Sequence, residues 1–246
     1  MPTIAQDLEL VKARIAQAAA RSKRSVDDIE LVAVTKTHSA ETVREAINAG
    51  LLLFGESKVQ EARAKIPLLP SNLRWHFIGH LQRNKVRHAL PLFELIHSVD
   101  SLELAQAIDR IAHEDGLHPR VLLEVNAAGE ASKFGFQPDK LRQEMESLLA
   151  FPRLTIEGLM CIPPLGQDAE TSRKYFVTLR ELRNSFENEF ALKLPHLSMG
   201  MTNDYTVAIE EGATLVRVGT AIFGERPKKQ KNKATDEHEF PQTSEL

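Results

Sequence analysis

The spacing of apolar residues along the chain predicts helices that alternate with short strands. Residues 3–22 carry apolar side chains at helical intervals, namely Ile4, Leu8, Val11, Ile15, Ala18 and Ala19. A β-branched run follows at 31–35, and such a run is typical of a strand that is buried on both faces. Ser39 is a suitable N-cap for the next helix, and Gly50 is a suitable stop signal after it.

The same alternation continues to the end of the apolar part of the chain. Strands are predicted at 31–35, 51–55, 73–79, 92–98, 121–126, 154–160, 196–199 and 214–219. After the first helix, further helices are predicted at 39–48, 57–66, 81–89, 101–115, 138–150, 168–191 and 204–211. Eight strands joined by helices predict parallel pairing with right-handed crossovers. A single α/β domain, a (β/α)8 TIM barrel, fits this count, although a doubly wound open sheet could hold similar elements.

The boundaries follow from composition. We expect the barrel to span residues 1–226 and the polar segment 227–246 to form a disordered tail, because it contains almost no apolar residues. The chain is 42% hydrophobic and 26% charged, as in an ordinary globular protein. Its one cysteine, Cys161, excludes an intrachain disulfide and a cysteine-rich zinc site.

Charge and apolar content also limit the expected partners and location. The formal net charge is -3, so no overall basic excess indicates a nucleic-acid partner. No stretch approaches the roughly 18 consecutive apolar residues of a membrane span, and the N-terminal segment has no signal-peptide pattern. We therefore expect a cytoplasmic protein with no membrane or nucleic-acid partner.

Lys36 is the first candidate for chemistry, because it directly follows the strand at 31–35. Active sites of barrels form at the carboxyl ends of the strands. If Val32 and Val34 point inward, the two-residue period of a strand turns Lys36 inward as well. A desolvated lysine has a lowered pKa and can act as a Schiff-base nucleophile. The alternative is a lysine whose stem packs at the strand end while its amine reaches water.

The ends of the seventh and eighth strands predict a phosphate site. Barrels commonly bind a phosphate there, through loop amides and hydroxyl groups. The candidates in the two segments are Ser198, Met199, Gly219 and Thr220. Arg217 lies two residues before Gly219, so both residues face the same side of the strand. An arginine that faces the barrel interior needs a partner, because burying an unpaired charge is costly. Glu56 is one candidate partner, and a ligand nitrogen is another.

These residues lie within a series of motifs that resembles the pyridoxal phosphate homeostasis protein family. The motifs are AVTK at 33–36, FGESKVQE at 54–61, WHFIGHLQRNK at 75–85, HSVD at 97–100, SKFGF at 132–136, EGLM at 157–160, LSMGMTND at 197–204 and VRVGTAIFG at 216–224. The resemblance covers about residues 8–226 in the family's order. It implies a barrel similar to the N-terminal domain of alanine racemase.

The resemblance also implies a cofactor and the residues that hold it. Pyridoxal 5′-phosphate (PLP) would be held as an internal aldimine on Lys36, with its phosphate around Ser198, Gly219 and Thr220. Arg217 would face the pyridine nitrogen. The chain departs from the family at Ser57, where asparagine is usual and often lies near the ring. It departs again at Lys58, at His80 and at Arg83, where the family usually has tyrosine, proline and serine.

The function that this resemblance implies is PLP binding and supply without robust turnover. An arginine at the pyridine nitrogen disfavours protonation of that nitrogen and weakens the cofactor as an electron sink. The barrel occupies almost the whole chain, so we expect no second domain to supply an acid/base tyrosine. Apo forms of PLP-dependent enzymes are expected partners, and a monomer is the expected state. The alternatives are a single-domain amino-acid racemase, with Lys36 alone or with Tyr205, and a phosphate-binding enzyme without PLP.

Overall fold

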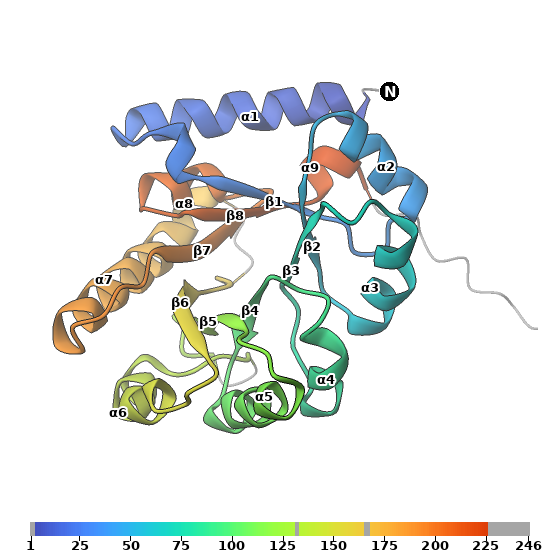
Figure 1. Ribbon diagram of the computed structural model, residues 1–246. Coiled ribbons are helices and arrows are strands. Elements are labelled where there is room, and N and C mark those ends of the chain that lie inside the picture. The colour runs from blue at the N-terminus through green and yellow to red at the C-terminus, as the bar shows by residue number, and fades with distance from the viewer. Residues whose placement is uncertain (1–2, 131–132, 165–167, 226–246) are drawn as a thin grey trace, which may run out of the picture.

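The eight strands close into one parallel barrel in the computed structural model, which describes residues 3–130, 133–164 and 168–225. Each strand pairs with the next in chain order, and the eighth pairs with the first (Figure 1). The strands are β1 (Glu30–Val34), β2 (Leu53–Glu56), β3 (Arg74–Phe77), β4 (Leu95–Val99), β5 (Arg120–Glu124), β6 (Thr155–Met160), β7 (His196–Met201) and β8 (Leu215–Val218). The predicted (β/α)8 barrel is confirmed, and the open sheet is excluded.

Helices surround the barrel on its outer face. They are α1 (Ile4–Arg21), α2 (Ala40–Asn48), α3 (Val59–Lys65), α4 (Val86–Ala89), α5 (Leu102–Asp115), α6 (Pro138–Leu149), α7 (Arg173–Glu189), α8 (Tyr205–Glu210) and α9 (Thr220–Phe223). The helix after β8, α9, has only four residues and is too short to cover the last strand. The N-terminal helix α1 packs against both α8 and α9 instead, and it covers this part of the barrel (Figure 1).

The interior of the barrel is built in layers. An apolar layer near the middle is formed by Val32, Leu53, Leu95, Leu122, Met160 and Leu215. Below it, at the amino ends of the strands, arginine and glutamate side chains form linked ion pairs. Arg74 pairs with Glu94 at 2.8 Å, and Arg120 bridges Glu94 and Glu157 at 2.7 Å each. This end of a barrel serves stability, so the chemistry is expected at the opposite end.

The strand alternation carries the candidate residues to that opposite end. Val32 is in the interior layer, so Val34 and Lys36 follow it toward the carboxyl mouth of the barrel. Leu215 is also in that layer, and Arg217 and Gly219 follow it in the same way.

The seventh strand is longer than predicted, which changes the depth of Ser198. β7 continues to Met201, two residues past the expected end at 199. Gly200 has a φ of +90° inside an irregular part of the pairing with β8. A Cβ there would lie 2.8 Å from the Tyr205 Cα atom, so only glycine fits. Ser198 therefore lies inside the barrel, three residues below the strand end.

Two expectations lie partly or wholly beyond these observations. The predicted tail, 227–246, is outside the described residues, and the boundary at 226 stays a prediction. Within the part of the chain that the structure describes, no helix has the length and apolar character that crossing a membrane requires.

Candidate functional site

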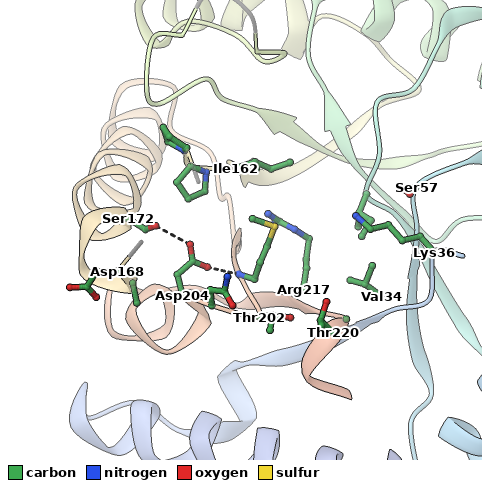
Figure 2. Close-up of a pocket in the computed structure, with 17 residues that line it drawn as sticks. Val34, Lys36, Ser57, Ile162, Asp168, Ser172, Thr202, Asp204, Arg217 and Thr220 are labelled. Carbon is green, nitrogen blue, oxygen red and sulfur yellow. Dashed lines mark hydrogen bonds between the residues drawn. The ribbon is translucent and has the colours of Figure 1, made fainter. Parts of the chain in front are cut away.

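A cavity of about 320 Å³ opens at the carboxyl ends of the strands. Its volume is in the range of small-molecule sites. The polar and charged residues that line it come from the ends of β1 and β2, from the segment between β6 and α7, and from the segments around the ends of β7 and β8. They are Lys36, Ser57, Asp168, Ser172, Thr202, Asn203, Asp204, Arg217 and Thr220 (Figure 2). Val34, Ile78, Ile162, Pro163 and Pro164 supply apolar walls.

Lys36 is held at the cavity by the residues on both sides of it. The Thr35 hydroxyl donates to Glu56 Oε1 at 2.7 Å, and the Thr35 carbonyl accepts a hydrogen bond from Lys65 Nζ at 2.8 Å. Thr37 has a φ of +69°, and its amide donates to Glu61. These contacts fix the turn after β1, so that the Lys36 side chain extends into the cavity (Figure 2).

Glu56 is the partner of Lys65, not of Arg217. Its Oε1 atom lies 2.6 Å from Lys65 Nζ, and both side chains are buried. Burial raises the pKa of Glu56, although the hydrogen bond and charge of Lys65 oppose this effect. Glu56 therefore belongs to the support of the β1 turn, and the suggested pairing of Glu56 with Arg217 is wrong.

Arg217 is anchored by neutral oxygen atoms. One of its terminal nitrogens donates to the Ser198 hydroxyl, and the other donates to the Cys161 carbonyl at 3.0 Å. The side chain is 4% exposed, and burial lowers the pKa of the guanidinium. Arginine titrates so far above neutrality that it remains a cation. Among the described residues no carboxylate forms an ion pair with Arg217.

The β7–β8 side of the cavity offers hydroxyl groups on a fixed turn. Asp204 accepts from the Met201 amide at 2.7 Å and from the Ser172 hydroxyl at 2.9 Å (Figure 2). This holds Thr202 at the cavity wall near Thr220. Gly219 packs tightly on β1, because a Cβ there would lie 3.2 Å from the Val34 carbonyl oxygen.

The structure brings together five of the seven residues selected from the sequence. Lys36, Ser57, Arg217, Gly219 and Thr220 all line the cavity. Ser198 and Met199 are not among the residues that line it. Ser198 is buried beneath Arg217, and Met199 packs in the apolar layer between strands and helices. A direct phosphate contact of Ser198 or Met199 stays a prediction.

Two residues that line the cavity, and one buried carboxylate outside its lining, were not identified from the sequence. Thr202 and Asp204 lie in the LSMGMTND motif and line the cavity. The strand was predicted to end at 199 but continues to Met201, so the prediction placed Ser198 instead of Thr202 at the end of the strand. Glu124 ends β5 and faces the interior, two residues after Leu122 of the apolar layer. Burial raises the pKa of Glu124 to about 7.

Neither of the two tyrosines lines the cavity. Tyr205 is buried in the apolar layer beneath α1, where burial raises its pKa. Tyr175 lies on α7 with Lys174 over its ring. The form of the racemase alternative in which Tyr205 moves a proton therefore lacks the required geometry, while the form with Lys36 alone is not tested by the position of the tyrosines.

Cys161 and His80 do not line the cavity either. Burial raises the pKa of Cys161 to about 12, so its thiol is not a nucleophile at neutral pH. His80 bonds to Asp100 at 2.9 Å and stacks on Phe134. Among the described residues, no three histidine, cysteine or acidic side chains are grouped to hold a metal ion.

The chemistry of the cavity fits PLP. Lys36 supplies an amine for an aldehyde, and Arg217 supplies donors for a ring nitrogen that accepts. Thr202 and Thr220 supply hydroxyl groups for a phosphate on the wall near Gly219. The three functions converge in one cavity that has the size of a small-molecule site.

Comparison with known proteins places this barrel in a class and in a family. Residues 6–227 match the family model of the alanine racemase N-terminal domain, so the class is that of alanine-racemase-type barrels. Alanine racemase from Clostridium difficile 630 shares this fold with a TM-score of 0.70 at 16% identity, and the match covers 91% of this chain and 58% of the racemase.

Closer relatives define the family. The pyridoxal phosphate homeostasis protein of Aquifex aeolicus is 44% identical over 89% of this chain and 96% of its own. That of Pseudomonas aeruginosa is 44% identical over 92% of this chain and 97% of its own. PipY of Synechococcus elongatus, in a structure with PLP bound, is 42% identical with a TM-score of 0.75, and the match covers 85% of this chain and all of PipY. The chain belongs to the pyridoxal phosphate homeostasis protein family, and the predicted resemblance is confirmed.

Proposed function

We propose that this protein binds PLP covalently through Lys36 and takes part in PLP homeostasis. The observation that carries the proposal is that Lys36 and Arg217 line one cavity, with the hydroxyl groups of Thr202 and Thr220 on its β7–β8 side. PLP, when bound, supplies an electrophilic carbon and a conjugated ring that can accept electrons. Relatives named for PLP homeostasis match over nearly all of their length, which supports the same role here.

Each residue has a defined task in this proposal. Lys36 holds the cofactor through its amine, and the Thr35 and Thr37 contacts keep that amine in the cavity. Thr202, Gly219 and Thr220 surround the phosphate. Arg217 donates to the ring nitrogen, which stays unprotonated because the guanidinium is already a cation.

The same residues favour storage and transfer of PLP over turnover. An unprotonated ring nitrogen makes the bound cofactor a weak electron sink, so carbanions gain little stabilisation. A racemase also needs an acid/base group on each face of its substrate. Neither tyrosine reaches the cavity, and Glu124 does not line it. We therefore propose a cytoplasmic carrier or regulator of PLP that hands the cofactor to apo-enzymes.

Reduction with borohydride followed by peptide mapping tests the attachment. We expect the pyridoxyl group on Lys36 and not on Lys65, whose amine is held by Glu56 and Thr35. Lys36→Ala should abolish the visible absorbance of the lysine-bound cofactor. The exposed Lys58→Ala change is the matched control and should retain that absorbance. An adduct mainly on another lysine, with Lys36 unmodified, would overturn the assignment.

A further inference from the structure

A chain of polar side chains lies beneath Arg217 in the barrel interior. Its members are His76 of β3, His97 of β4 and Ser198 of β7, and each is at most 1% exposed. The Ser198 hydroxyl lies 2.8 Å from His97 Nδ1, and His97 Nε2 lies 3.0 Å from His76 Nδ1. Buried polar groups are costly unless they are hydrogen-bonded, and the buried His76 Nε2 has no hydrogen-bond partner among the described residues, so the chain needs a reason to be there.

The direction of every hydrogen bond in the chain follows from Arg217. A guanidinium can only donate, so the Ser198 oxygen accepts from Arg217. His97 Nδ1 is then the one acceptor in reach of the Ser198 proton among the described residues. A neutral His97 must carry its proton on Nε2, which donates to His76 Nδ1. His76 in turn carries its own proton on Nε2.

The surroundings keep both histidines neutral. Burial lowers the pKa of His97 well below its usual range, and the charges of Arg217 and His196 act in the same direction. Burial lowers the pKa of His76 to about 4, while the charges of the arginine–glutamate pairs at the bottom of the barrel act in both directions. The chain thus ends in neutral groups, and the second anchor of Arg217, the Cys161 carbonyl, is neutral too.

We infer that His97 and His76 are positioning residues that act through Ser198 to hold Arg217 in place without neutralising its charge. A carboxylate at the position of Ser198 would fix the guanidinium equally well, but it would offset the positive charge that faces the cavity. A chain of neutral groups leaves the full charge for a ligand atom that accepts a hydrogen bond. The identity of that atom as the PLP ring nitrogen rests on the proposed function. The protonation pattern of the histidines does not.

The protonation pattern is tested first, on the wild-type protein without PLP. Nitrogen-15 NMR distinguishes a protonated ring nitrogen from an unprotonated one. At pH 7 both histidines should show a bare Nδ1 and a protonated Nε2. A proton on Nδ1 of His97, or a charged His97 ring, would overturn the inference whatever the protein binds.

Ligand binding then tests the action on Arg217. His97→Leu removes the acceptor of the Ser198 proton, while His97→Gln offers an oxygen to Ser198 and an amide proton to His76. Met160→Leu alters an apolar interior residue that pairs with Ser198 between β6 and β7 but makes none of the hydrogen bonds of the chain, and it is the matched control. The probes are PLP and an analogue in which carbon replaces the ring nitrogen.

His97→Leu should weaken PLP binding about tenfold, as expected when a buried hydrogen bond loses one partner. It should weaken binding of the carbon analogue less than about twofold. His97→Gln should restore most of the affinity for PLP. Met160→Leu should leave the affinity for both ligands unchanged. Equal losses for both ligands, or no loss at all, would refute the positioning role. Failure of the wild type to bind PLP would instead count against the proposed function.

Discussion

Replacing Glu124 with glutamine should stabilise the protein at alkaline pH and have little effect in acid. Glu124 is 8% exposed and faces the barrel interior at the end of β5. Its carboxyl group makes no side-chain hydrogen bond within the described residues. Burial raises its pKa from 4.5 to about 7, helped by the charge of Asp100 and opposed by that of Arg217. The glutamine keeps the shape and never ionises.

The magnitude follows from these two pKa values. Between pH 4.5 and about 7 the folded protein holds a proton on Glu124 that the unfolded chain has released. The free energy of unfolding therefore falls as the pH rises through this window. Each pH unit contributes about 1.4 kcal/mol, so above pH 7 the ionised Glu124 costs the fold on the order of 3 kcal/mol. The variant avoids this cost.

Urea unfolding of the cofactor-free protein at two pH values measures the effect. Glu124→Gln should raise the free energy of unfolding by about 1 kcal/mol or less at pH 5 and by about 3 kcal/mol at pH 8.5. Glu103→Gln, at an exposed position on α5, is the control and should show no such trend. A gain for Glu124→Gln that is the same at both pH values would refute the argument, because it would not come from ionisation.

Three further tests concern the site and its supports. Lys65→Met leaves the carboxylate of Glu56 buried without its cation and should lower the free energy of unfolding by about 3 kcal/mol. Thermal or urea unfolding measures this loss, and adding Glu56→Gln to Lys65→Met should recover part of the lost stability. A stability equal to wild type would show that the pair is not needed. Thr202→Val combined with Thr220→Val should weaken PLP binding at least tenfold, a factor of ~1.4 kcal/mol, and should affect pyridoxal little. Ser198→Ala should weaken the binding of PLP and of pyridoxal equally, because Ser198 acts through Arg217 at the ring. A loss of affinity for PLP alone would instead indicate that Ser198 contacts the phosphate.

Most of the architecture could be predicted from the sequence, because the strands and helices of a parallel barrel alternate regularly along the chain. Buried strands are continuous apolar runs, and the helices between them have their own period. The periodicity alone did not decide between a closed barrel and an open sheet, and the packing of α1 beside α9 could not be predicted. Closure depends on the pairing of β8 with β1. The packing of α1 depends on the short length of α9, which leaves β8 uncovered.

The site was predictable where strand alternation leads to the carboxyl end of the barrel, as at Lys36 just after β1 and at Arg217 within β8. It was not predictable where the backbone departs from regular geometry. Gly200 allows β7 to continue with an irregular register, which moves Ser198 into the interior and brings Thr202 to the wall. His97 lies in a fully buried strand with a register shift between Ile96 and Val99, so no alternating pattern reveals which face it occupies.

The carrier function is tested most directly by measuring PLP transfer and amino-acid turnover in the same preparation. PLP-loaded wild-type protein, freed of unbound cofactor, is mixed with an apo-enzyme that requires PLP, and it is separately incubated with a panel of amino acids. If the protein is a PLP carrier, the apo-enzyme should gain activity, and Lys36→Ala carried through the same loading should confer none. No amino acid should be converted over multiple turnovers. Hundreds of turnovers on any amino acid, abolished by Lys36→Ala, would contradict the carrier function and establish an enzyme.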